Sequence, residues 1–216
     1  MPALQCPPPR TSPSVPSKSR RRKSAADTMW YPWTSTPPPP ADEPVQIAQA
    51  KVHLRVVHDD ENALIQSLIA ASRDHAERYC NACFAEQTVT MRCDSFADMS
   101  RLPLGPLKSV TSITYFDEAG EVQTLAPETY EEHKDGLEPW VGLKADQTWP
   151  RTKPGTRITL VAVFGGDAPA TVVQAILLLI GVWYENREQT VIGTIASPLP
   201  GTVNVDALLS NHRRGV

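Results

Sequence analysis

The best case for chemistry in this sequence rests on four residues: His75, Cys80, Cys83 and Cys93. Cys80 and Cys83 have the Cys-x-x-Cys spacing of a zinc knuckle, and His75 and Cys93 are near enough in the sequence to supply two more ligands. The same spacing occurs in redox-active thiol pairs. However, no second closely spaced pair follows, and Cys80 falls where a helix is expected to end. We therefore expect ordinary free cysteines and no cofactor.

A second candidate is the run from His58 to Glu61, which could offer oxygen ligands to a divalent ion. Helix capping explains the same residues more simply, because acids favour a first helical turn and Asp59 suits an N-cap. The sequence contains no nucleophile motif, phosphate-binding loop or dinucleotide fingerprint, and the pair Gly165–Gly166 is expected to be a strand-to-helix turn. The residues therefore give no positive case for an enzyme.

The element that organises the chain is the apolar stretch from Val172 to Tyr184, which only Gln174 interrupts. A helix that is apolar on every face is buried on every face. The stretch is about thirteen residues long, too short for the roughly 20 that span a bilayer. We expect a helix over about 170–188, capped by Thr171 and covered by its own domain alone or also by a neighbouring subunit.

Two further helices are expected, over about 45–54 and about 60–80, and Asn81 suits the left-handed residue that ends the second. The apolar or small face of the second helix consists of Leu64, Ile65, Leu68, Ile69, Ser72, Ala76 and Tyr79. Its charged residues, which we expect in solvent, are Arg73, Asp74, Glu77 and Arg78.

From Glu86 the period of the pattern changes to two, which predicts five or six short antiparallel strands over about 86–165, joined as local hairpins. The fold class is therefore α+β: a small helical bundle with an inserted antiparallel β subdomain and extended N- and C-terminal arms. The expected boundaries are 1–44 for the first arm, 45–188 for the domain and 189–216 for the C-terminal tail.

The N-terminal arm differs from the rest in charge and proline content. Residues 1–28 hold six basic residues and one acid, a net charge of +5, whereas the remainder holds 15 basic and 23 acidic residues, a net of −8. We expect residues 1–28 to be disordered, or to be an upstream mis-start before Met29. Residues 29–44 are expected to be an extended arm whose Trp30 and Trp33 dock on the domain or on a partner.

The acidic body argues against a surface that grips nucleic acid, which needs clustered Lys and Arg. No signal peptide and no membrane span are apparent, so synthesis in a reducing cytoplasm is the simplest expectation.

At the C-terminus, a linker rich in Pro and Gly precedes a short apolar cluster. The alternation from Val203 to Asp206 predicts an extended segment that could add to the edge of a partner's sheet. Leu208 and Leu209 are expected to pack either on the parent domain or on another protein.

Several of these segments together resemble one family. They are 45–56 (VQIAQAKVHLRV), 59–65 (DDENALI), 69–72 (IAAS), 86–88 (EQT), 107–113 (LKSVTSI), 175–179 (AILLL), 183–188 (WYENRE), 199–201 (LPG) and 207–209 (ALL). In order and spacing they look like the head–tail connector proteins (adaptor or head-completion proteins) of long-tailed phages, prophages and gene transfer agents. The likeness covers about residues 45–212. Asn81-Ala82-Cys83 departs from the pattern, where a small turn and a basic residue are expected.

The resemblance implies a structural virion protein, made in the host cytoplasm, that forms a homo-oligomeric ring, commonly of twelve subunits, in the neck. The ring would lie under the portal protein at the capsid vertex, contact a tail or stopper/terminator protein, and let DNA pass through its lumen without sequence-specific binding. On this basis the expected subunit interface is Ile176, Leu179, Ile180, Gly181, Trp183, Tyr184 and Arg187. The expected portal-docking residues are Val203, Val205, Leu208, Leu209, Arg213 and Arg214. The alternative is a small zinc- or nucleic-acid-binding regulatory protein that uses the cysteines and the basic tail.

Overall fold

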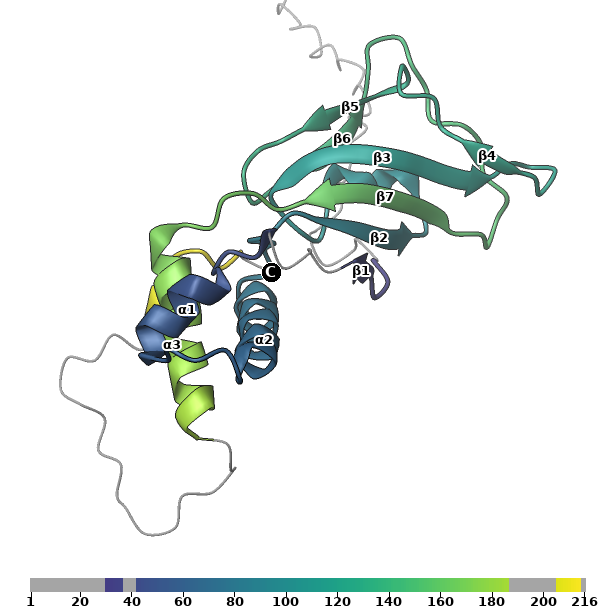
Figure 1. Ribbon diagram of the computed structural model, residues 1–216. Coiled ribbons are helices and arrows are strands. Elements are labelled where there is room, and N and C mark those ends of the chain that lie inside the picture. Colours follow the sequence, from purple (N-terminus) through teal and green to yellow (C-terminus); the bar gives the residue numbers. More distant parts are fainter. Residues whose placement is uncertain (1–29, 37–41, 187–204, 215–216) are drawn as a thin grey trace, which may run out of the picture.

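A computed structural model describes residues 30–36, 42–186 and 205–214 of the 216-residue chain (Figure 1). The helices gather at one end of the molecule and the strands at the other, so the described part is elongated. The β part is inserted between the second and third helices along the chain. This arrangement confirms the α+β class and the helical body with an inserted antiparallel subdomain.

The helical part consists of α1 (Ile47–Leu54), α2 (Asn62–Cys80), α3 (Ala170–Glu185) and the short α4 (Val205–Ser210). Their buried apolar side chains form one core cluster: Val45, Ala50, Ile65, Ile69, Ala76, Cys80, Ala82, Phe84, Val172, Ala175, Ile176, Leu177, Ile180 and Leu209. The predicted long helices are therefore present, and the amphipathic stripe of α2 supplies Ile65, Ile69 and Ala76 to this core.

Two of the predicted helix caps are wrong, although the predicted left-handed end of α2 is confirmed. The N-cap of α2 is Glu61, with no side-chain cap bond, and Asp59 instead accepts hydrogen bonds from the side chains of Lys51 and Asn62. The N-cap of α3 is Pro169 rather than Thr171. At the other end of α2, Asn81 has a φ of 51°, the αL conformation that closes a helix.

The β part contains a five-stranded antiparallel sheet in the order β1-β2-β7-β3-β4. Its strands are β1 (Thr34–Thr36), β2 (Gln87–Cys93), β3 (Leu107–Phe116), β4 (Val122–Thr124) and β7 (Ile158–Phe164). Strands β5 (Tyr130–His133) and β6 (Trp140–Leu143) form a separate pair, and a 3-10 helix, η3 (Phe96–Ser100), follows β2.

Six strands thus lie between α2 and α3, as predicted, but they are not all local hairpins. Strand β2 pairs along its whole length with β7, from Gln87 opposite Phe164 to Cys93 opposite Ile158. The two strands that connect directly to the long helices are therefore neighbours in the centre of the sheet. Their inward side chains build a second core that includes Met91, Leu160 and Phe164.

The N-terminal arm docks on its own domain. Strand β1 covers the free edge of β2, with Thr34 opposite Thr90 and Thr36 opposite Thr88. The indole Nε1 of Trp30 donates a hydrogen bond to the carbonyl oxygen of Arg101 at 3.0 Å. The arm therefore closes an edge that would otherwise expose unpaired backbone groups.

Within the described ranges, no helix combines the length and the apolarity needed to cross a bilayer.

Candidate functional surfaces

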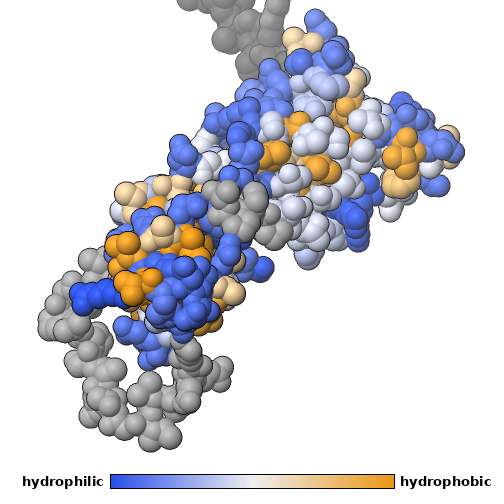
Figure 2. All heavy atoms as spheres, in the orientation of Figure 1, coloured by the Kyte–Doolittle hydropathy of each residue, from blue (hydrophilic) through white to orange (hydrophobic). Residues whose placement is uncertain are grey.

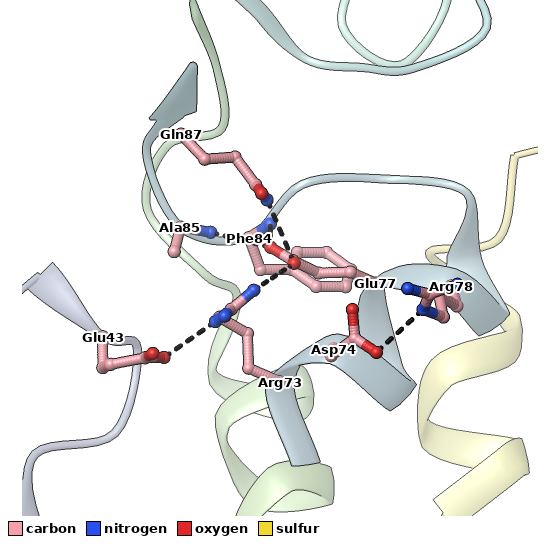
Figure 3. A network of polar contacts seen from close by, with 8 residues as sticks. All are labelled: Glu43, Arg73, Asp74, Glu77, Arg78, Phe84, Ala85 and Gln87. Atoms are coloured by element: carbon pink, nitrogen blue, oxygen red, sulfur yellow. Dashed lines mark hydrogen bonds and ion pairs between the residues drawn. The ribbon is translucent and has the colours of Figure 1, made fainter. Parts of the chain in front are cut away.

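A buried polar network joins the helical part to the sheet, and its centre is the carboxylate of Glu77 on α2 (Figure 3). Its Oε2 atom accepts hydrogen bonds from Arg73 Nη1 at 2.6 Å and from Gln87 Nε2 at 3.0 Å. Its Oε1 atom accepts from the backbone N–H groups of Phe84 at 2.7 Å and Ala85 at 3.2 Å. One side chain thus binds the helix, the turn after it and the start of β2.

The same network reaches the start of the helical part through Glu43, whose Oε2 atom accepts from Arg73 Nε at 2.9 Å. Burial raises the pKa of Glu43, and the charge of Arg73 opposes that rise. The prediction that Arg73 and Glu77 lie in solvent is therefore wrong: both are buried, whereas their neighbours Asp74 and Arg78 form an exposed ion pair.

A glycine completes this junction on the side of β7. Gly165 has a φ of +104°, and a Cβ atom there would lie 2.0 Å from the carbonyl oxygen of Ala85. Only glycine fits that backbone conformation and that close approach. The expected strand-to-helix turn is confirmed, and it packs directly against the turn that Glu77 holds.

The C-terminal helix α4 packs on the chain's own body. Leu209 is fully buried (0% exposed), and its carbonyl oxygen accepts a hydrogen bond from Cys80 Sγ at 3.5 Å. The backbone N–H of Arg214 donates to the carbonyl of Cys80 at 2.8 Å. The guanidinium of Arg214 forms a bidentate pair with Glu138, both contacts at 3.1 Å.

These contacts correct the expectations for the C-terminal tail. Val205 begins a helix, not an extended segment, because packing on α2 and α3 outweighs the alternating pattern. Leu209 and Arg214 are held by the parent domain, which was one of the two alternatives for the leucines. Leu208 is half-buried and Arg213 is exposed, while Val203 lies outside the described residues. Portal docking by any of the six stays a prediction.

The expected subunit interface on α3 divides into a buried and an accessible part. Ile176 and Ile180 are fully buried and Leu179 nearly so, which leaves these three covered within the chain itself. Gly181, Trp183 and Tyr184 are half-buried. The chain's own core surrounds Ile176 and Ile180, and a subunit contact by the predicted set stays a prediction.

The accessible end of α3 already has contacts within the chain. Trp183 packs edge-on against His75 with 6.0 Å between ring centroids, and the Tyr184 hydroxyl donates to Glu61. Arg187 lies outside the described residues.

The three described cysteines are divided between the two core clusters. Cys80 belongs to the helical core, while Cys83 and Cys93 belong to the β core. Burial raises the pKa of Cys80 to about 11 and those of Cys83 and Cys93 to about 12. Because the thiolate is the metal ligand and the nucleophile, such thiols are unreactive. In the described part of the chain no group of three or more His, Cys, Asp or Glu is placed to hold a metal ion.

A groove of about 580 Å³ lies between the N-terminal arm and the end of α2, with Trp33 and Asp74 among the residues that line it. Its ionised groups already pair with one another or with the backbone: Asp74 with Arg78, and Glu77 with its four donors. The lining therefore presents no acid and base poised to act on a substrate.

Known proteins share both the sequence pattern and the fold. Residues 44–132 match the family model described as "Phage gp6-like head-tail connector protein". The matched segment contains α1, α2 and the strands β2 to β4. No curated protein matches the chain.

Three solved structures have a similar fold. A chain in "Neck of empty GTA particle computed with C6 symmetry" superposes with a TM-score of 0.68 at 19% identity, covering 86% of this chain and 97% of that one. A chain in "Virion of native gene transfer agent (GTA) particle" gives 0.67 at 21% identity, with coverages of 85% and 96%. A chain in "Neck of native GTA particle computed with C12 symmetry" gives 0.65 at 21% identity, with 86% and 97%.

The fold and the family match together define a class of structural, non-enzymatic proteins, the head–tail connectors. By the match of its residues 44–132, this chain is similar to the phage gp6-like head–tail connector proteins. The resemblance seen in the sequence is thereby confirmed, as is the expectation that the chain is not an enzyme.

Proposed function

We propose that this chain forms a ring, of twelve copies, in the neck of a phage or gene transfer agent particle. The ring joins the portal vertex of the capsid to the tail, or to a stopper or terminator protein, and DNA passes through its lumen. The observation that carries the proposal is the shared fold. It extends over 86% of this chain and nearly the whole length of a chain in a neck computed with C12 symmetry.

The charge of the body supports passage of DNA. Outside residues 1–28 the chain has a net charge of −8, with 15 basic and 23 acidic residues. Like charges repel, and DNA carries a dense row of phosphates. An acidic ring therefore holds DNA weakly and lets it slide, and it needs no sequence-specific contact.

The accessible part of the C-terminal segment remains the proposed portal contact. Leu209 and Arg214 hold α4 on the body and thereby position the segment. Among the described members of the predicted set, those that stay accessible beside them are the half-buried Val205 and Leu208 and the exposed Arg213. Repetition around a ring would sum weak single contacts through avidity.

Native mass spectrometry of the full chain, with and without the portal protein, tests the ring. A high-order species is expected alone or once the portal protein is present, and twelve copies are expected in the complex. A strict monomer under both conditions contradicts the proposal.

A further inference from the structure

The groove between the N-terminal arm and the end of α2 lies where the helical part meets the sheet. On the face drawn in Figure 2, apolar residues gather over the helical part, and the sheet presents mostly residues of intermediate hydropathy. The groove combines both characters: its base is apolar, and its walls carry aromatic and polar side chains. The base consists of Ala82, Cys83, Val89 and Leu104. Such a lining suits a ligand that is itself partly apolar and partly polar, such as a peptide.

One wall of the groove is formed by two tryptophans of the arm, Trp30 and Trp33. The indole N–H of Trp30 is already bound to the carbonyl oxygen of Arg101. Trp33 differs, because its side chain is 42% exposed and its indole N–H donates to no other described residue. An exposed indole offers a flat apolar face and a hydrogen-bond donor side by side. Grooves lined in this way are the ones that bind proline-rich segments.

The opposite wall is the C-terminal end of α2, and it selects for an uncharged ligand. Asp74 and Arg78 neutralise each other there in an exposed ion pair, and the carboxylate of Glu77 is saturated by its four donors. Beside them lies Asn81, whose carboxamide forms no hydrogen bond with another described residue. The lining residues thus offer neutral hydrogen-bonding groups and no unpaired charge.

The chain itself contains a ligand of this kind. Residues 1–29 lie outside the described part and join it at Trp30, in the wall of the groove. They include the uncharged segment Pro13-Ser14-Val15-Pro16. A Pro-x-x-Pro segment favours the polyproline II conformation, whose backbone has no internal hydrogen bonds and therefore leaves its carbonyl groups free to accept. Residues 17–29 separate this segment from Trp30, and a flexible chain of that length spans roughly 20 Å, which is enough to return to a groove that begins at Trp30.

We propose that residues 13–16 dock in the groove of their own chain, with a proline ring on the indole of Trp33 and a backbone carbonyl accepting from its N–H. Because the segment is joined to the groove, its local concentration there is on the order of millimolar, which favours it over a proline-rich peptide of another molecule. Docking would hold the basic run from Lys18 to Lys23 beside the junction of the helices and the sheet. The inference is independent of the proposed ring.

Disulfide trapping in the full chain tests the docking. In a Cys6→Ser background the remaining native cysteines are buried. Ser14→Cys is combined either with Arg78→Cys, in the wall of the groove, or with Ala71→Cys, an exposed position about 10 Å away along α2 and outside the groove. Under mild oxidation the link within one chain is expected to form about tenfold faster at position 78, which a modest docking free energy suffices to give. Equal rates at the two positions contradict the proposal.

Changes in the prolines identify the segment that docks. Pro13→Ser with Pro16→Ser, added to the pair at positions 14 and 78, is expected to slow linkage to the rate seen with position 71. Pro7→Ser with Pro9→Ser is the matched control, since it removes as many prolines from the same tail, and it is expected to leave the rate unchanged. Equal effects of the two changes would overturn the assignment to residues 13–16. Linked dimers in place of the link within one chain would show that the groove receives the tail of another copy, which also overturns the inference.

Discussion

The buried carboxylate of Glu77 determines how the helical part of the molecule is joined to the sheet. Both of its carboxylate oxygens are saturated by donors from three segments of the chain. Removing one partner from such a network leaves a buried group uncompensated, which costs far more than the intact pair contributes. The side chain therefore fixes the position of α2 relative to β2.

Glu77→Gln is expected to destabilise the fold by about 3–5 kcal/mol, because Arg73 would keep a buried charge with one carboxylate fewer. Urea unfolding of the purified variant measures this. The matched control is Asp74→Asn on the same helix, which breaks only the exposed pair with Arg78 and is expected to cost less than about 1 kcal/mol. Equal losses in the two variants would show that the Glu77 network carries no special stability.

The sequence could not reveal this network, because the partners are distant along the chain. Arg73 and Glu77 are four residues apart and look like an ordinary surface pair. Their burial depends on Glu43, which enters from before α1, and on the turn at Phe84 and Ala85, whose N–H groups need an acceptor. By contrast, Asn81 and Gly165 could be placed correctly, since local backbone geometry alone requires them.

At the scale of elements, α4 is a short helix whose position depends on its contacts with other elements. Six residues are too few to form a stable helix in isolation. Leu209, in the core, and Arg214, which follows the helix and binds Glu138, fasten its C-terminal end to the body. The alternation of apolar and polar residues from Val203 to Asp206 predicted an extended segment here, because such a pattern carries no information about contacts with distant elements.

Leu209→Ala is expected to destabilise the fold by about 2–5 kcal/mol, since it empties a fully buried site. Thermal or urea unfolding provides the measurement. Leu208→Ala is the matched control, and its half-buried side chain is expected to cost distinctly less. If Leu209→Ala melts like the wild type, α4 does not belong to the core.

The attachment of α4 is expected to weaken in acid. The hydrogen bond from Arg214 lowers the pKa of Glu138 below its usual 4.5. A carboxylate with a lowered pKa stabilises the fold above that ordinary value, and this stabilisation is lost as the pH falls through the folded-state pKa. The stability difference between wild type and Arg214→Gln should therefore be present at pH 7 and shrink below about pH 4.5. A difference that stays constant over this range would contradict the role of the pair.

At the scale of the whole molecule, the charge is divided between a basic tail and an acidic body. The full chain is expected to bind duplex DNA weakly. A plot of the logarithm of the association constant against the logarithm of the salt concentration should have a slope no steeper than about −5, because only six basic residues lie in the tail. The chain of residues 29–216 is expected to show no binding. Fluorescence anisotropy over a salt series measures both. Equal binding by the two chains would mean that the body itself grips DNA.

The topology was only partly predictable. The number and approximate bounds of the strands between α2 and α3 follow from alternation, as do the two longest helices from their apolar periodicity. The pairing of β2 with β7 does not, because residues such as Gln87 and Phe164 are far apart in the sequence and nothing local specifies them. The exposure of Val52, Val57 and Val182 was also missed, since a pattern alone does not show which faces other elements cover.

The pairing of β2 with β7 has a mechanical consequence. Both strands leave the sheet toward the helices at the same end, where Gln87 faces Phe164. A pull between the helical part and the sheet therefore draws both strands in the same direction and does not slide one past the other. Tension falls on the connections 81–86 and 165–169 together, and on the first it acts on the N–H groups that Glu77 binds. In a neck under strain, a force probe should find Glu77→Gln weaker to such pulling than wild type, while equal rupture forces would exclude this path for the load.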